Sequence, residues 1–579
     1  MIFIILRNTV GQIASFLVLA ALASLSLMSC SEQNDAPVPQ AGVPAVSMPD
    51  PYSAKVAADI LSQGGNAVDA AVAAGFVLAV THPESGNIGG GGFMTLAVPG
   101  ASGSDVHFLD YREKAPAAAH RDMYLGADGN VVEGLSFTGP LSVGVPGTVA
   151  GLYESHRRFG SLPWSDLVQP SVRLAREGFL PDEKMVAMLR ESEARLISVA
   201  NFSTYFSHME QGVLFKQPEL AATLQRIAEH GSDGFYKGET ADHLIATMET
   251  YGGLITHDDL DAYEVRWRQP LTFEWQGYDV VTAPLPSSGG IALAQLFGMK
   301  SELDEAFKEA PLGSDHYVHL IAEIEKRVFA DRAQHLGDPD FVTAPLASLM
   351  DAEYLAQRAG EVNRDEISLE GDVRPGLQES KETTHFSIVD GMGGAVSNTY
   401  TLNWEYGSGV VVEGAGFLLN DEMDDFSAKP GIENAYGVIG DEANAIAPGK
   451  RMLSSMSPTL LMKDGRPRIV IGTPGGSTIF TSVFQVLLNS EIHRLGVSEA
   501  VNRRRFHHQL PGGQIVYFEG TRPLEPSLVE ALETRGYQVE KLWNTIGDVQ
   551  MIKVHEDGTV EAASDSRGRG MALVGPYKD

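Results

Sequence analysis

Two short alternating segments around a glycine-rich turn constrain this chain more than any other stretch. Residues 384–389 and residues 395–401 each alternate in a way that predicts a strand, and an Asp-Gly and a Gly-Gly pair lie between them. An antiparallel hairpin centred on that turn places Thr383 opposite Thr401. Asn403 lies on the same face, because strand side chains alternate with period two. Threonine is common in strands, so the pattern alone also fits an ordinary hairpin.

A second hairpin is predicted over residues 457–472, with its turn at another Asp-Gly pair. Counting back from that turn places Ser455 opposite Pro474, next to the pair Gly475-Gly476. These glycines precede an apolar helix predicted over residues 478–488. Free N–H groups at the start of a helix bind anions, and glycine permits close approach, so we expect an oxyanion to bind here.

Helical patterns lie on both sides of these hairpins. Asp50-Pro51 is a good helix start, and the following segment 67–80 is apolar all round, which predicts a buried helix. Residues 291–303 and 316–335 are also predicted to be helical. Residues 140–265 are mostly helical in pattern, and we assign no chemistry to them.

Composition excludes several classes of protein. The chain has 579 residues, 43% of them hydrophobic, which is ample for a large core. Its formal net charge of −32 makes a nucleic-acid partner unlikely on electrostatic grounds. Because Cys30 is the one cysteine, an intramolecular disulfide framework is excluded.

The N-terminal residues 1–29 resemble a secretion signal, with a single charge at Arg7 and an apolar run too short to span a bilayer. Leu27-Met28-Ser29-Cys30 resembles the lipobox of bacterial lipoproteins, in which cleavage precedes a lipidated cysteine. We therefore expect export to the bacterial periplasm or cell envelope, a lipid anchor on Cys30 and a flexible tether over residues 30–47. The alternative is an ordinary secreted protein whose Cys30 is incidental.

Five further blocks occur in an order and spacing that resemble one known family. They are Glu-Thr-Thr-His-Phe-Ser (382–387), Thr-Tyr-Thr-Leu-Asn (399–403), Leu-Leu-Asn-Asp-Glu-Met-Asp-Asp-Phe (418–426), Leu-Ser-Ser-Met-Ser-Pro-Thr (453–459) and Gly-Thr-Pro-Gly-Gly-Ser (472–477). Together they resemble the γ-glutamyltransferase (γ-glutamyl transpeptidase) family over residues 45–575. The resemblance implies an α+β fold, the four-layer αββα sandwich of N-terminal nucleophile hydrolases, made of two chains from one precursor.

The resemblance also implies how the chain is processed and how it works. The precursor would cleave its own Glu382–Thr383 bond, giving a large subunit over residues 48–382 and a small, catalytic subunit over residues 383–579. Thr383 would be the nucleophile, with its new α-amine as the base. Thr401 would orient it, and the amides of Gly475 and Gly476 would bind the oxyanion.

The implied substrate is a γ-glutamyl compound such as glutathione, with water or an amino acid or peptide as acceptor. The expected carboxylate-binding residues are Arg112, Ser454 and Ser455, the expected ammonium-binding residues are Asn403, Glu422 and Asp425, and Tyr436 is the expected gating residue of a lid over residues 429–450. Arginine suits the binding of the substrate carboxylate because its planar guanidinium can bind a carboxylate through two hydrogen bonds. No metal or organic cofactor is implied.

Other interpretations stay open at this level. Arg112, which follows a predicted strand over residues 106–111, would by itself be read as half of a surface ion pair. The acidic run 421–425 lacks the ligand spacing of an EF-hand. A cephalosporin (glutaryl) acylase or a poly-γ-glutamate hydrolase would share the same fold. A non-catalytic lipoprotein is the alternative from another class.

Overall fold

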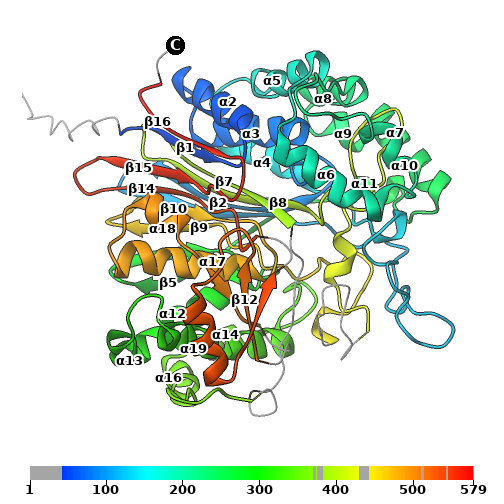
Figure 1. Cartoon of the computed structure of the whole chain (residues 1–579). Helices are drawn as coiled ribbons and strands as arrows, with labels where there is room; N and C mark the ends of the chain where they lie inside the picture. The colour runs from blue at the N-terminus through cyan, green and yellow to red at the C-terminus, as the bar shows by residue number, and fades with distance from the viewer. Residues whose placement is uncertain are drawn as a thin grey trace, which may run out of the picture. The chain divides into compact units, whose positions relative to one another are not determined.

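The computed structural model describes residues 42–369, 373, 382–429, 442–509, 514–542 and 545–577 (Figure 1). The expected signal peptide, Cys30 and Tyr436 lie outside the described residues. The tether expected to reach residue 47 is shorter, because β1 (Ala45–Met48) is a buried strand of the larger sheet. Among the described residues, no helix combines the length and apolar content that crossing a membrane requires.

The first helices form as their sequences predict. α2 (Pro51–Ser62) begins after Asp50, whose side chain accepts a hydrogen bond from the Ser53 N–H. α3 (Ala67–Thr81) begins with a capping box between Asn66 and Asp69, and all of its residues are buried. A helix that is apolar all round must be covered on every side, and α3 packs against helices and against the sheet beneath it.

The larger sheet has seven antiparallel strands in the order β16 (Met571–Val574), β1, β7 (Glu382–Val389), β8 (Ala395–Asn403), β2 (Gly91–Gly100), β3 (Gly103–Tyr111) and β4 (Arg266–Arg268). Its outer face is covered by α2 and α3 together with α4 (Thr148–Phe159). This sheet therefore combines strands that precede the Glu382–Thr383 bond in the sequence (β1, β2, β3 and β4) with strands on its C-terminal side (β7, β8 and β16).

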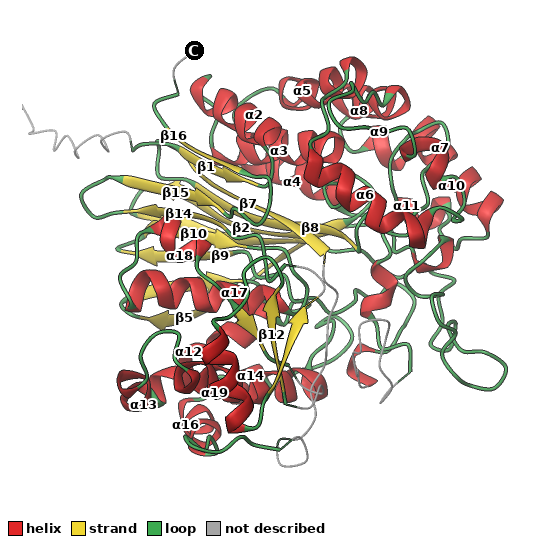
Figure 2. Ribbon diagram, in the orientation of Figure 1, coloured by secondary structure: helices red, strands yellow, loops and turns green. Residues whose placement is uncertain are grey.

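The second sheet has six strands in the order β15 (Val560–Ser564), β14 (Gln550–Val554), β10 (Arg466–Gly472), β9 (Thr459–Lys463), β6 (Tyr278–Thr282) and β5 (Leu271–Trp275). It packs face to face on the first sheet around a small apolar cluster that includes Val389, Leu460 and Ile552. Its outer face is covered by α12 (Gly289–Glu302), α14 (Asp315–His335) and α17 (Thr478–Leu487). The two stacked sheets between two helical layers confirm the predicted αββα sandwich (Figure 2).

The remaining elements complete these layers. They are η1 (Pro140–Ser142), α5 (Trp164–Glu177), α6 (Glu183–Leu196), α7 (Phe202–Phe206), α8 (Pro218–His230), α9 (Asp233–Tyr236), α10 (Gly238–Tyr251), α11 (His257–Asp261), α13 (Asp304–Glu309), α15 (Leu346–Leu349), α16 (Ala352–Gly360), η2 (Glu422–Asp425), η3 (Glu442–Asn444), the π-helical η4 (Leu488–Ile492), α18 (Val497–Asn502), α19 (Pro526–Arg535) and a three-stranded sheet of β11 (Phe506–His507), β12 (Ile515–Glu519) and β13 (Gln538–Leu542).

The register of the first hairpin confirms the prediction, and that of the second corrects it. Thr384 pairs with Tyr400 as expected, but Glu382 pairs with Asn403, so Thr401 and Leu402 stand opposite Thr383 alone and form a bulge in β8. In the second hairpin the predicted pairing is wrong beyond Pro467, because Arg468 is an extra residue that bulges out of β10. The expected pairing of Ser455 with Pro474 is absent from the described ladder, which ends at Thr459 and Gly472.

Candidate active site

Thr383 stands at the start of β7, where the bulge interrupts the pairing of β7 with β8. Its side chain is buried, at 6% exposure, and its Oγ1 donates to the Oγ1 of Thr401 on β8 at 3.5 Å. The Thr401 Oγ1 also accepts the Asn403 N–H at 2.7 Å. Bulges are common next to active sites because they re-aim a side chain, and this one, at Thr401 and Leu402 of β8, lies beside a cavity that both Thr383 and Thr401 line.

That cavity gathers residues from six separate stretches of the chain. It is lined by Arg112, Thr383, Thr401, Asn403, Glu422, Asp425, Ser454, Ser455, Met456, Gly476 and Ile479. Every substrate-binding residue that the sequence predicted and the structure describes thus lines the same cavity as the predicted nucleophile. Met456 and Ile479 were not predicted, and they supply apolar walls.

Arg112 organises one end of the cavity. It follows β3 directly, is fully buried, and its guanidinium binds both Glu422 and Asp425 of η2. A third carboxylate, Glu113, lies 3.6 Å from the same guanidinium. The reading of Arg112 as half of a surface ion pair is therefore wrong, because the strand delivers it into the interior.

The charge at this end is unbalanced. Burial raises the pKa of Glu422 and of Asp425 while Arg112 opposes that rise, and burial raises the pKa of Glu113 to about 8. Both carboxyl oxygens of Glu113, and one oxygen each of Glu422 and Asp425, have no hydrogen-bond partner among the described residues. Three acidic groups around one guanidinium, with spare acceptor oxygens, suit a ligand that carries a cation beside an anion.

A second arginine supports the serine pair at this end. Arg332 of α14 donates from Nη2 to the Ser455 Oγ at 3.3 Å and from Nε to the Ser288 Oγ at 2.6 Å. The Ser288 hydroxyl in turn donates to the Ser454 carbonyl at 2.8 Å. Sequence reasoning missed Arg332 and Ser288. The available signal was that Arg332 continues the buried stripe of α14 four residues after Val328, where an apolar side chain would be expected.

Gly475 and Gly476 form the loop that enters α17. Both have positive φ, at +130° and +56°, and a Cβ on Gly475 would lie 2.4 Å from the Thr478 Oγ1. Their carbonyl oxygens accept the N–H groups of Thr478 and Ile479. Among the described residues, neither glycine N–H has an acceptor, and Gly476 lines the cavity beside Thr383. Two free backbone donors next to a nucleophile can stabilise an oxyanion.

The histidines near these strands are poor candidates for a base. His385 is fully buried between the hydroxyls of Thr399 and Ser387, and burial lowers its pKa to about 3. Burial likewise lowers the pKa of His508 to about 3. Neither lines the cavity. The base for Thr383 must therefore come from elsewhere in the site.

Comparison with known proteins agrees with this geometry. The family model described as "Gamma-glutamyltranspeptidase" matches residues 53–575. A glutathione hydrolase proenzyme of Pseudomonas aeruginosa is 57% identical over 531 residues, which cover 92% of this chain and 94% of the relative.

Two solved structures are also similar. A gamma-glutamyltranspeptidase from Pseudomonas nitroreducens complexed with L-DON matches with a TM-score of 0.55 and 57% identity, over 57% of this chain and 97% of that one. A cephalosporin acylase from Bacillus halodurans matches with a TM-score of 0.79 and 25% identity, over 92% of this chain and 96% of that one.

Proposed function

The chain belongs to the gamma-glutamyltranspeptidase family and is a γ-glutamyltransferase and glutathione hydrolase, and we propose that it cleaves its own Glu382–Thr383 bond to become active. The observation that carries this proposal is the convergence of Thr383, Arg112 and Gly476, whose N–H has no acceptor among the described residues, on one cavity. A hydroxyl, a site for a zwitterion and an oxyanion hole are together what acyl transfer from a γ-glutamyl amide requires.

Cleavage supplies the missing base. A threonine hydroxyl is a weak nucleophile, and in the precursor the Thr383 nitrogen is an amide that cannot take a proton. Once the Glu382–Thr383 bond breaks, that nitrogen becomes a free α-amine, whose ordinary pKa of about 7.7–8.0 suits general-base catalysis near neutral pH. Thr401 then holds the Thr383 hydroxyl in place through the contact between their Oγ1 atoms.

Binding of the glutamyl head exchanges ion-pair partners. Arg112 is bound to Glu422 and Asp425 in the structure. The α-carboxylate of the substrate takes the Arg112 guanidinium together with the Ser454 and Ser455 hydroxyls, while the two released carboxylates and Asn403 take the α-ammonium. A zwitterion can make this exchange without leaving any buried charge unpaired, which explains why so acidic a cluster is tolerated.

The reaction then runs in two acyl-transfer steps. The Thr383 Oγ attacks the γ-carbonyl carbon, the α-amine takes the hydroxyl proton, and the N–H groups of Gly475 and Gly476 stabilise the oxyanion. The amine passes its proton to the leaving nitrogen, which departs as cysteinylglycine when glutathione is the donor. Water, or the amine of an amino acid or peptide, then resolves the γ-glutamyl-enzyme.

A glutaryl acylase would use the same nucleophile but a different pocket. A glutaryl group has no α-ammonium, so Glu422 and Asp425 would face it without a cation. That mismatch favours a γ-glutamyl substrate. We expect the purified enzyme to hydrolyse a γ-glutamyl anilide about 10- to 150-fold faster than the matching glutaryl anilide, since a lost charged hydrogen bond costs about 1.5–3 kcal/mol.

The test of self-cleavage is N-terminal sequencing of the smaller fragment. At 62.2 kDa for 579 residues, residues 30–382 and 383–579 weigh about 38 and 21 kDa. The smaller fragment should begin Thr-Thr-His, and Thr383→Ala should stay whole and inactive. Thr383→Ser is the matched control, because it keeps a hydroxyl beside the amine and should still be cleaved. Full activity in an unbroken chain would refute the mechanism.

The location is proposed on sequence alone. Export directed by residues 1–29 and lipidation of Cys30 would hold the enzyme at a bacterial membrane. Its large and small subunits would be assembled there as a heterodimer.

A further inference from the structure

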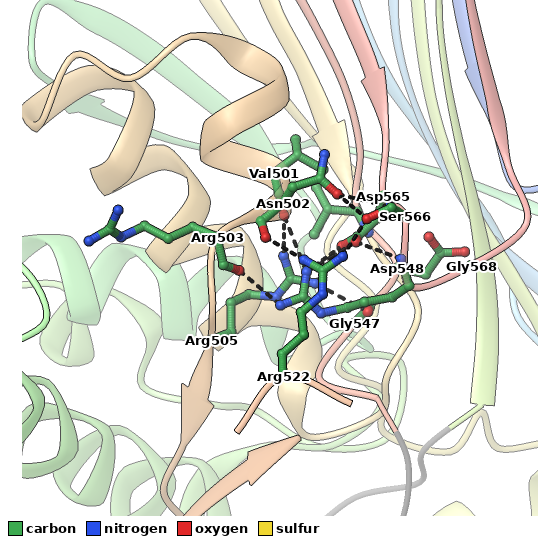
Figure 3. Close-up of polar contacts among 12 residues, drawn as sticks. Val501, Asn502, Arg503, Arg505, Arg522, Gly547, Asp548, Asp565, Ser566 and Gly568 are labelled. Atoms are coloured by element: carbon green, nitrogen blue, oxygen red, sulfur yellow. Dashed lines mark hydrogen bonds and ion pairs between the residues drawn. The ribbon is translucent and has the colours of Figure 1, made fainter. Parts of the chain in front are cut away.

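A buried ionic cluster lies behind the loop that carries Gly475 and Gly476. It consists of Arg505, which follows α18, Glu519 at the end of β12, and Asp565 and Arg567 in the segment after β15, and the most exposed of the four is at 9%. Figure 3 shows Arg505 and Asp565 of this cluster beside Gly547 and Asp548. Arg505 binds Asp565 at 2.5 Å, and Arg567 binds Asp565 at 3.0 Å and Glu519 at 2.6 Å. None of the four lines the active-site cavity.

This cluster holds one short piece of backbone, the 546–549 loop. Arg505 donates to the carbonyl oxygens of residues 546 and 547 at 2.7 and 3.2 Å. Glu519 accepts the N–H of residue 546 at 2.7 Å, and Asp565 accepts the N–H of residue 549 at 3.2 Å. Both ends of the loop are therefore tied to charged side chains that are themselves locked together.

The 546–549 loop in turn contacts the oxyanion loop, residues 473–476. The Asp548 N–H donates to the Thr473 Oγ1 at 2.8 Å, and the Thr473 hydroxyl donates to the Pro474 carbonyl at 2.8 Å. A Cβ on Gly547 would lie 2.7 Å from the Thr473 Oγ1, and a Cβ on Gly475 would lie 3.3 Å from the Gly547 nitrogen. The backbones of the two loops thus lie almost in contact, and the Thr473 hydroxyl links them through its two hydrogen bonds.

We propose that Thr473 is a positioning residue, and that it transmits the rigidity of the 546–549 loop and its ionic cluster to the oxyanion amides of Gly475 and Gly476. Glycines at positive φ have no side chain to hold them, so their N–H groups must be aimed by contacts from outside. An oxyanion hole works only when its donors are held at hydrogen-bond distance from the developing charge. The inference rests on the proposed function.

Holding the 546–549 loop in place explains the buried ionic cluster better than a contribution to the stability of the fold does. Taking charged groups out of water costs free energy that their pairing often only balances, so a buried ion pair is weak evidence for stability. Here Arg505, Glu519 and Asp565 hydrogen-bond a loop that contacts the oxyanion loop, and Arg567 forms ion pairs with Glu519 and Asp565.

The test compares Thr473→Val with Thr473→Ser in the processed enzyme. Valine keeps the shape of the side chain but loses the hydroxyl that links the two loops. We therefore expect kcat to fall about 10- to 100-fold, which is the effect of a misplaced hydrogen-bond donor in an oxyanion hole. The KM for the γ-glutamyl donor, whose head is held at the Arg112 end, should change less than about twofold. Serine keeps the hydroxyl and should restore kcat to within about threefold of the wild type.

Thr247→Val is the matched control. Thr247 is also buried, and its hydroxyl likewise donates to one carbonyl, of His243 at 2.8 Å, and accepts one N–H, of Glu413 at 3.1 Å. It lies in α10, outside the cavity lining, so its loss should leave kcat unchanged. Equal loss of kcat in both valine variants, or a loss carried by KM, would overturn the proposal.

Gly547→Ala provides an independent perturbation if Thr473→Val does not fold. Its new methyl group would press on the Thr473 Oγ1, and we expect the same fall in kcat at constant KM. Wild-type kcat in soluble Gly547→Ala would refute the inference. An inactive wild-type enzyme would instead refute the proposed function.

Discussion

At the scale of single residues, the site is defined by one buried guanidinium that lies among three acidic side chains. Arg112 is shared among Glu113, Glu422 and Asp425, and each carboxyl has its pKa raised by burial. The zwitterionic head of the substrate adds no net charge, but its anion can pair with Arg112 and its cation with the carboxylates. Arg332 matters in the same way, since it holds the Ser455 hydroxyl that faces the substrate carboxylate.

A pH dependence of stability follows from Glu113. Burial raises its pKa from 4.5 to about 8, so the folded state holds a proton that the unfolded chain releases. Its contribution to the free energy of unfolding therefore falls as the pH rises from about 4.5 to about 8, by at most about 1.4 kcal/mol per pH unit. Glu113→Gln cannot ionise, so its Tm should fall less between pH 6 and pH 9 than that of the wild type.

Thermal unfolding across this pH range checks the expectation. Glu133→Gln makes the same change at an exposed position and should follow the wild type. Parallel Tm curves for the wild type and Glu113→Gln would show that Glu113 does not hold a proton.

At the scale of elements, the nucleophile strand is anchored to the first helical layer by its own turn. Asp390, at the end of β7, accepts the N–H groups of Met392 and Gly394 at 2.8 and 2.7 Å. Its second oxygen accepts the Ala67 N–H at the start of α3 at 3.0 Å. One buried carboxylate therefore closes the hairpin and caps a helix that comes from the other subunit.

Asp390→Ala should accordingly be costly. It leaves the buried N–H groups of Gly394 and Ala67 without their acceptor, which should lower the free energy of unfolding by about 2 kcal/mol or more. Asp390→Asn keeps one oxygen for the turn but turns a donor toward Ala67, so its Tm should fall between those of the wild type and the alanine variant. An unchanged Tm for Asp390→Ala would contradict this account of the hairpin.

At the scale of the whole molecule, the proposed cleavage at Glu382–Thr383 would divide both sheets between a large and a small subunit. β1, from the large subunit, lies between β16 and β7 of the small subunit, and β2 of the large subunit pairs with β8 of the small one. In the second sheet, β6 pairs with β9 across the same division. The two subunits share both sheets and their apolar cores.

The two subunits should therefore never separate under native conditions. Size-exclusion chromatography of the processed enzyme should give one peak that contains both fragments, and denaturing electrophoresis should resolve them. If the subunits separated, each of them would expose unpaired strand edges and the apolar faces of half a sheet. Elution of a folded, separate small subunit would disprove the interleaved arrangement.

Much of the local structure could be predicted from sequence, because local rules govern it. The position of the glycine-rich turn determined the register of the β7–β8 hairpin and hence the approach of Thr383 to Thr401, and the start of α2 followed from Asp50 and Pro51. The site residues required the family resemblance as well, since no periodicity links Arg112 to a pair of carboxylates about three hundred residues away.

The sequence by itself thus determined the hairpins, the helix starts and, through its motifs, the chemistry. Only the tertiary structure decided the bulge at Arg468, the burial that gives Glu113 a raised pKa, the support of Ser455 by Arg332 and the contact of the 546–549 loop with Thr473. The physical reason is that these features depend on how two sheets and their helices stack, and so on desolvation and packing between residues far apart in the chain.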